Sequence, residues 1–215
     1  MSDSVRRLPV YLVLDCSGSM FGPSIEAVRQ GVKYLLGDLR GDPQALETVW
    51  LSVITFDSSA RQVVPLTELG QFQEPQLDPG GSTNLAQALK ILMASIDTEV
   101  RKMTADQKGD WKPLVFLMTD GVPDSGCGWE TVADELKKRR PGNIIACACG
   151  PDAKTDVLKR LTEVVVEMRN YTPDTFKAFF KWVSASVTTA SQKIGGNNDP
   201  ALGDLPPPPA AIQMV

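Results

Sequence analysis

The stretch LPVYLVLDCSGSM, residues 8–20, decides the fold class of this chain. It opens with an unbroken apolar run, LPVYLVL, which is typical of a strand buried on both faces of a sheet. Asp15, Ser17 and Ser19 then follow at alternate positions. Oxygen-bearing side chains add nothing to a buried strand, so these residues form either an ordinary polar turn or a site that binds a positive group.

Outward from this stretch, strand-like apolar runs alternate with helical patterns along the chain. Strands are expected over residues 8–15, 48–57, 60–66, 113–120, 143–150 and 164–170, and helices over about 23–39, 84–104, 130–139, 155–161 and 173–189. The tight polar turn after residue 57 indicates an antiparallel edge strand, where Pro65 is tolerated. The alternation predicts an α/β fold: a doubly wound, mostly parallel six-stranded sheet with one antiparallel edge strand and helices on both faces.

The composition changes abruptly after Ser191. Residues 1–190 fit a single domain, which is the expectation for 215 residues. Residues 191–215 are rich in glycine and proline and offer little apolar surface to bury. They are predicted to form a flexible C-terminal tail, with a polyproline ligand for a partner as the alternative.

Composition and charge exclude several classes of protein. The chain is 42% hydrophobic and 22% charged, which is ordinary for a globular domain. A net charge of −4 argues against nucleic acid as a partner, because phosphate binding needs clustered cations. The one dense basic run, KKRR at residues 137–140, closes a predicted helix, where cations complement the helix dipole; a phosphate-binding patch is the alternative.

The N-terminal stretch and the cysteines point to the cytoplasm. MSDSVRRLPV has no apolar targeting region, and no apolar run reaches membrane-spanning length. Cys16, Cys147 and Cys149 lie in or beside predicted core strands, and Cys127 falls in a loop. The chain has no histidine and no CxxC pair to complete a zinc site, so all four are predicted to be reduced thiols.

Two further segments bring oxygen-bearing side chains to the end of the sheet where Asp15 lies. Asp120 ends a strand that should neighbour the first one across the point where strand order reverses. In DPGGSTNLAQAL, residues 78–89, a glycine turn leaves Ser82 or Thr83 at a helix start, where the simpler role is an N-cap. A bound cation would relieve the repulsion between two carboxylates. Oxygen ligands favour Mg²⁺ or Mn²⁺ over zinc.

These motifs resemble the von Willebrand factor A (VWA) family, whose metal-ion-dependent adhesion site (MIDAS) combines a DxSxS motif with a distant threonine and a distant aspartate. The matching residues are Asp15, Ser17 and Ser19 in DCSGS, Thr83 in GGSTN and Asp120 in MTDG. The resemblance covers residues 8 to about 190. PVYLVLDCSGSM, KPLVFLMTDGVPDS and FKAFFKWVSASV look most like the bacterial tellurium-resistance TerY-like branch. The stretch DSGCGW, 124–129, lies outside the resemblance, and no role is assigned to Asp124.

The resemblance implies a Rossmann-like fold and a protein-binding module, not an enzyme. In such a module the hydroxyls ligate the ion directly, the aspartates act largely through water, and a protein partner's Asp or Glu completes the shell. Loops near Met20, Phe21 and Pro123 would add apolar contact. The family branch implies a stress response, sometimes alongside a kinase or phosphatase. The net charge and the short apolar runs argue against nucleic acid and a membrane as partners. Two alternatives stay open: a metal-dependent hydrolase, and a structural scaffold with a vestigial site.

Overall fold

Seven strands form one sheet in the computed structural model, which describes residues 6–106, 108–150, 153–168, 170, 172–192 and 205–215. The strand order is β3-β2-β1-β4-β5-β6-β7. The strands are β1 (Leu8–Asp15), β2 (Val49–Phe56), β3 (Ala60–Glu68), β4 (Leu114–Thr119), β5 (Asn143–Cys149), β6 (Val164–Met168) and β7 (Gln213–Met214). The predicted α/β class with a mostly parallel sheet is confirmed. The predicted number of six strands is wrong, because β7 adds a second antiparallel edge.

The central strands are buried along their whole length, which explains their unbroken apolar runs. β1 pairs in parallel with β2 on one side and with β4 on the other, and the predicted adjacency of β1 and β4 is confirmed. β3 pairs with β2 in the antiparallel direction and carries Pro65 at the edge. Cys147 and Cys149 are buried in β5, as predicted, and each contributes to the core that α6 covers.

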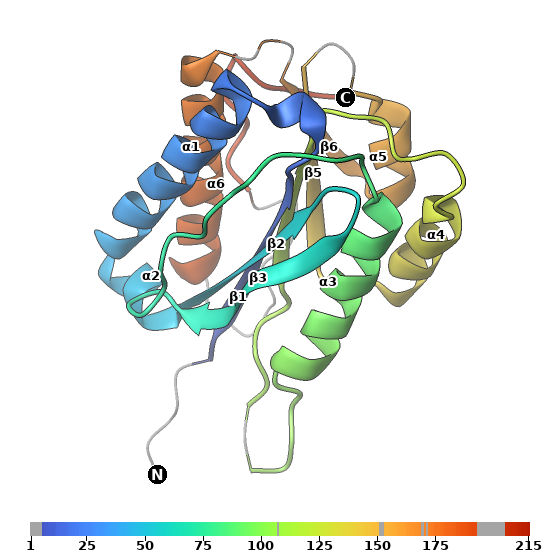
Figure 1. Cartoon of the computed structure of the whole chain (residues 1–215). Coiled ribbons are helices and arrows are strands. Elements are labelled where there is room, and N and C mark those ends of the chain that lie inside the picture. Colours follow the sequence, from blue (N-terminus) through green and yellow to red (C-terminus); the bar gives the residue numbers. More distant parts are fainter. Residues whose placement is uncertain (1–5, 107, 151–152, 169, 171, 193–204) are drawn as a thin grey trace.

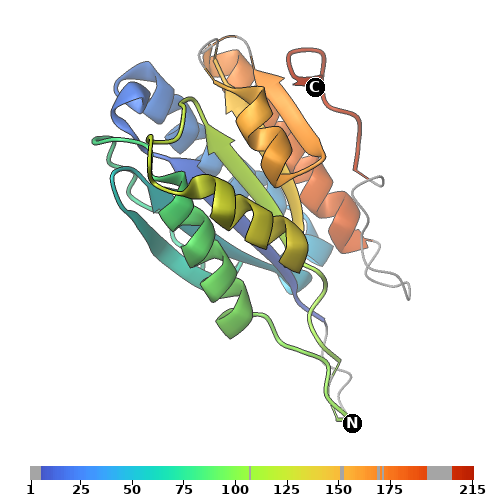
Figure 2. The same cartoon turned by 90° about the vertical axis from the view of Figure 1, so that its right-hand side faces the viewer.

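Helices cover both faces of the sheet (Figures 1 and 2). They are α1 (Pro23–Arg40), α2 (Pro43–Thr48), α3 (Leu85–Glu99), α4 (Trp129–Arg139), α5 (Thr155–Leu161) and α6 (Pro173–Gln192). α1, α2 and α6 pack on one face, and α3, α4 and α5 pack on the other. α1 and α6 approach closely at Gly31, where an added Cβ would lie 2.0 Å from the Phe180 ring. None of the described helices is both long and apolar enough to cross a bilayer.

One predicted helix end is wrong, and one helix was not predicted. α3 ends at Glu99 and not near residue 104, because Glu99 is held in place: its carboxylate accepts hydrogen bonds from Tyr11 and Gln62, and its carbonyl accepts one from Arg7. α2 was not predicted, since its single short turn shows no periodicity. It forms because Asp42 caps the Ala45 amide at 2.8 Å and proline follows at the first helical position.

The C-terminal segment packs against the domain. β7 pairs in the antiparallel direction with β6, the Trp182 indole donates to the Pro206 carbonyl at 2.7 Å, and Ile212 is 3% exposed. The predicted flexible tail is therefore corrected for residues 205–215, because the core strand and Trp182 give this segment partners that its composition does not reveal. Residues 193–204 of the predicted tail lie outside the described residues, and the domain boundary at residue 190 stays a prediction.

Candidate functional site

Three loops meet at the carboxyl end of the sheet, where strand order reverses between β1 and β4. The first loop follows β1, the second precedes α3, and the third follows β4. The first two are joined by their backbones: the Gly18 amide donates to the Gly81 carbonyl at 3.0 Å, and the Gly80 amide donates to the Cys16 carbonyl at 2.8 Å. An added Cβ at Gly18 would lie 3.1 Å from the Gly81 oxygen, so a larger residue would strain this contact.

Asp15 is buried at the end of β1, with 1% of its surface exposed. Its Oδ1 accepts a hydrogen bond from the Ser17 amide at 2.8 Å, and its Oδ2 accepts one from the Thr119 hydroxyl at 2.5 Å. Burial is the main cause that raises the pKa of Asp15 from 3.8 to about 6. The hydrogen bonds from Thr119 and Ser17 oppose this rise, and the nearby charge of Asp120 adds to it. Thr119 was not singled out from the sequence, because a threonine at a strand end is common.

A chain of hydroxyls links the first loop to the third. The Ser17 and Ser19 hydroxyl oxygens are 3.1 Å apart, and the Ser19 hydroxyl donates to Asp120 Oδ1 at 2.7 Å. Ser17 and Asp120 are buried, whereas Ser19 is exposed. The structure thus brings Asp15, Ser17, Ser19 and Asp120 into one cluster from two strands that are far apart in sequence.

Thr83 joins this cluster from the loop before α3. Its hydroxyl lies 3.2 Å from the position that a Cβ would take on Gly121, directly after Asp120. The N-cap of α3 is Asn84, whose side chain accepts from the Gln87 amide at 3.1 Å. The simpler role of Thr83 as an N-cap is therefore excluded, and its hydroxyl forms no hydrogen bond within the described part of the chain.

Asp124 holds the Thr83 segment in place, a role that the sequence did not reveal. Its carboxylate accepts hydrogen bonds from the Ser82 hydroxyl at 2.6 Å and from the Thr83 amide at 3.0 Å. In return, the Asp124 amide donates to the Thr83 carbonyl at 2.9 Å. A possible signal was a carboxylate in a loop rich in proline and glycine, but nothing in the sequence names its partner.

The rim of the site carries two exposed apolar side chains. Phe21, directly after η1 (Gly18–Met20), is 63% exposed, and Val122, in the loop after β4, is 52% exposed. Of the predicted rim residues, Met20 and Pro123 are instead buried, because the short 3-10 helix η1 (Gly18–Met20) turns the Met20 side chain into the core. Val122 takes the place predicted for Pro123.

The five candidate side chains offer only oxygen atoms, from three hydroxyls and two carboxylates. Within the described ranges, no group of three or more His, Cys, Asp or Glu residues is arranged to hold a metal ion. A cation at this end of the sheet would therefore need serine and threonine hydroxyls beside Asp15 and Asp120. This donor set fits a hard cation such as Mg²⁺ and does not fit zinc, which prefers nitrogen and sulfur ligands.

Comparison with known proteins identifies the family. A model of the von Willebrand factor type A domain matches residues 10–184. The chain belongs to the von Willebrand factor type A family. Inter-alpha-trypsin inhibitor heavy chain H2 of Mesocricetus auratus is 26% identical to this VWA chain over 170 residues, which cover 71% of the chain and 16% of the relative. Thrombospondin-related anonymous protein of Plasmodium falciparum is 28% identical over 147 residues, covering 62% of the chain and 23% of the relative.

Solved structures agree on the fold of the VWA domain. A von Willebrand factor type A protein from Catenulispora acidiphila superposes with a TM-score of 0.63 at 18% identity, covering 86% of this chain and 43% of that one. At this identity the likeness shows the fold alone. The VWA chain spans less than a quarter of the length of the two curated relatives above, 16% and 23%.

Proposed function

We propose that this VWA domain is a protein-binding module that holds one Mg²⁺ or Mn²⁺ through Asp15, Ser17, Ser19, Thr83 and Asp120. The observation that carries the proposal is the convergence of these five residues on one cluster, with Asp15 buried at the end of β1 and Asp120 buried directly after the neighbouring β4. Burying two carboxylates together is unfavourable, and a cation between them would offset that cost.

A bound ion would supply a positive centre that attracts a carboxylate of the partner. Three neutral hydroxyls among the ligands leave much of the ion's charge unneutralised, which favours an acidic group from outside. Phe21 and Val122 are placed to add apolar contact around such a carboxylate, since both are more than half exposed. Membership of the VWA family supports a protein as the partner.

A binding role is proposed in preference to catalysis. Hydrolysis at a metal needs a base that can take a proton from water, and the chain contains no histidine. The carboxylates of Asp15 and Asp124 are both engaged by hydrogen bonds from neighbouring loops. They therefore serve better as ligand and as loop anchor than as a mobile base.

The biological setting is proposed on the resemblance of three sequence segments to the TerY-like branch. That resemblance supports a tellurium-resistance-type stress response with a kinase or phosphatase of the same system as the partner. The relatives reported above do not bear on this setting. The cytoplasmic location rests on the sequence and stays a prediction.

Calorimetry with Mn²⁺ and Mg²⁺ tests the metal. The parent is expected to bind one ion, and Ser17→Ala with Ser19→Ala is expected to weaken binding about tenfold or more, ~1.4 kcal/mol. Ser24→Ala is the matched control, because Ser24 lies on the first turn of α1 outside the cluster. Equal affinity in the parent and the double variant would show that the serines are not ligands.

Affinity capture tests the partner. A partner is expected to be retained in Mg²⁺, released by EDTA, and not captured by the double serine variant. Urea unfolding of the same variant separates binding from folding, since lost turn hydroxyls would lower stability by about 0.5–2 kcal/mol each. Retention of the partner in EDTA, or turnover of p-nitrophenyl phosphate by the pure protein, would contradict a metal-dependent binding module.

A further inference from the structure

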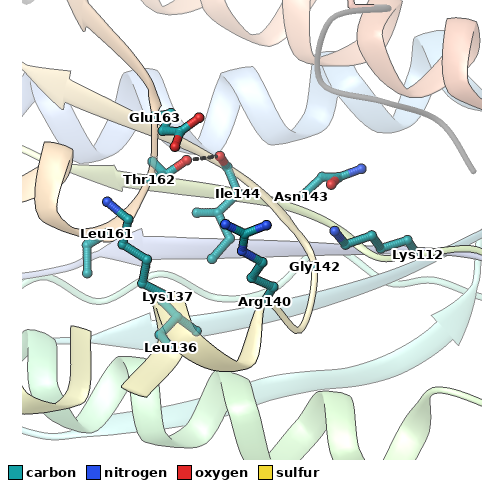
Figure 3. Close-up of a pocket in the computed structure, with 10 residues that line it drawn as sticks. All are labelled: Lys112, Leu136, Lys137, Arg140, Gly142, Asn143, Ile144, Leu161, Thr162 and Glu163. Carbon is teal, nitrogen blue, oxygen red and sulfur yellow. Dashed lines mark hydrogen bonds between the residues drawn. The ribbon is translucent and has the colours of Figure 1, made fainter. Parts of the chain in front are cut away.

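A second polar feature lies at the opposite end of the sheet. A pocket of about 190 Å³ opens where β4, β5 and β6 begin and where α4 and α5 end (Figure 3). Its walls are formed by Lys112, Leu136, Lys137, Arg140, Gly142, Asn143, Ile144, Leu161, Thr162 and Glu163. Every one of these residues is described, and none belongs to the cluster around Asp15.

Positive charge dominates the pocket. Lys112, Lys137 and Arg140 contribute three cations, and Glu163 contributes one carboxylate. Figure 3 shows Lys137 and Arg140 extending from the end of α4 toward Thr162 and Glu163, with Lys112 entering from the opposite side. Within the described part of the chain, Glu163 forms no ion pair with these cations. Lys137 and Arg140 therefore line a hollow in which no described residue forms an ion pair with them.

The structure divides the basic run at residues 137–140 between two roles. Arg139 turns toward α3 and forms ion pairs with Asp97 and with Glu135. Lys137 and Arg140 line the pocket, and the Arg140 side chain forms no ion pair or hydrogen bond with any described residue. The helix dipole favours cations at the end of α4, and Lys112 adds a third cation to the pocket from the segment before β4.

Arg140 has an unusual backbone conformation. It is the one residue other than glycine with positive φ among those described, at φ 47 and ψ 52. Glycine is strongly favoured at this place after a helix, because it adopts the left-handed conformation without steric strain. A strained arginine here is better explained by what its side chain reaches than by its role in ending α4.

The floor of the pocket is apolar. Leu136, Ile144 and Leu161 line it, and all three are buried. The Thr162 hydroxyl is already used, since it donates to the Ile144 carbonyl at 2.6 Å (Figure 3). A dry cavity of about 150 Å³ is large enough for benzene. The pocket thus has room for a ring-sized apolar body below and an anionic group above.

We propose that this pocket binds a small organic anion, with its carboxylate or phosphate held by Lys137, Arg140 and Lys112 and its apolar body against Leu136, Ile144 and Leu161. A bare inorganic anion would leave the apolar lining uncovered, and a neutral ring would leave Lys137 and Arg140 without a counter-charge. Glu163 at the rim limits the total negative charge that the pocket accepts. This site is separate from the proposed metal cluster and does not depend on it.

Phenyl phosphate and benzoate are the probes. Inorganic phosphate, which lacks the ring, and benzyl alcohol, which lacks the charge, are the controls. Titration of the full chain, followed by NMR at the amides of Gly142, Asn143 and Glu163, is expected to show saturable binding of at least one organic anion. Its affinity should exceed that of inorganic phosphate and of benzyl alcohol by tenfold or more. The ratio of the affinities for phenyl phosphate and benzoate shows whether the pocket prefers a phosphate or a carboxylate.

Variants in the basic run separate the pocket from general charge effects. Arg140→Gly and Lys137→Gln are each expected to weaken binding of the probe tenfold, and Glu163→Gln to strengthen it a few-fold. Lys138→Gln is the matched control, since Lys138 is exposed in the same run and does not line the pocket. EDTA should leave the affinity for the probe unchanged, because this site is independent of the proposed metal. Absence of saturable shifts at these amides, equal weakening by Lys138→Gln, or full affinity in Arg140→Gly would overturn the proposal.

Discussion

The two ends of the sheet carry opposite charge and are built in different ways. At the carboxyl end, Asp15, Asp120 and Asp124 are tied to serine and threonine by short hydrogen bonds, and most of the cluster is buried. At the amino end, Lys137 and Arg140 are exposed and stand apart around a hollow. Parallel strands deliver their following loops to one end, so buried polar groups converge there. The positive charges that line the pocket at the other end come from exposed side chains at the end of α4 and from Lys112 before β4.

The largest expected difference between the two ends is in metal binding. Asp120→Ala should weaken Mn²⁺ binding about 100-fold, ~2.7 kcal/mol, because it removes one of two carboxylates. Asp78→Ala is the control, since Asp78 is exposed and carries the same charge. Calorimetry measures both variants, and binding of phenyl phosphate at the amino end should stay within twofold. Similar Mn²⁺ affinity in the two variants would show that general negative charge, and not a defined cluster, attracts the ion.

The amino end depends on a close backbone contact, which gives the next largest effect. Gly142→Ala should lower the free energy of unfolding by about 1–3 kcal/mol, because the added Cβ would lie 2.9 Å from the Pro113 carbonyl oxygen. Gly37→Ala is the matched control: no atom lies within 4 Å of its added Cβ, and alanine should stabilise α1 by roughly 0.5–1 kcal/mol. Urea unfolding measures the free energy of unfolding of both variants. Equal stability of the two variants would show that the loop at Gly142 adjusts freely.

Substitution of Asp124 tests whether the carboxyl end needs the carboxylate that holds the Thr83 segment in place. Asp124→Ala should lower the free energy of unfolding by about 1–2 kcal/mol, because the Ser82 hydroxyl and the Thr83 amide lose their acceptor. Mn²⁺ binding should weaken with it, since Thr83 is no longer held beside Gly121. Asp124→Asn keeps one acceptor and should recover part of both losses. If the alanine variant loses stability but binds Mn²⁺ as the parent does, Thr83 is not a ligand.

The smallest expected effect is a gain in stability, whereas the preceding variants, controls aside, lose stability or metal affinity. Arg140→Gly should raise the free energy of unfolding by about 0.5–1 kcal/mol, since glycine relieves the left-handed strain but adds freedom to the unfolded chain. Urea unfolding of this variant beside Lys138→Gln measures the gain. A loss of stability would mean that the Arg140 side chain contributes to packing. The two ends of the sheet would then differ less, since the basic end too would be held by contacts of its charged side chains.

The sequence predicted the features that depend on local pattern. β1 and β4 could be read from their apolar runs, and Asp15 and Asp120 from their places directly after those runs. Their adjacency followed from the rule that sites in such sheets form where strand order reverses. The convergence of Thr83 on the same point depended on the resemblance to a family, because a threonine before a helix fits a cap equally well.

The features that were missed depend on tertiary partners. Asp124 is recognisable only once Ser82 and Thr83 lie beside it, and β7 forms only because β6 offers an open edge. The whole of β4 and α4 lies between Lys112 and Arg140 in the sequence, so no short spacing relates them. Met20 was placed on the rim because a polar motif surrounds it, whereas η1 turns it inward.

The short pairing of β7 with β6 also affects how copies of this protein meet one another. An uncovered β6 would present the backbone of a valine-rich strand, VVVEM, to any other chain, and such open edges are templates for aggregation. Residues 213–214 cover part of that edge, and Pro65 interrupts the opposite edge at β3. A segment that contributes little to the core can therefore still decide whether the protein stays dispersed at high concentration.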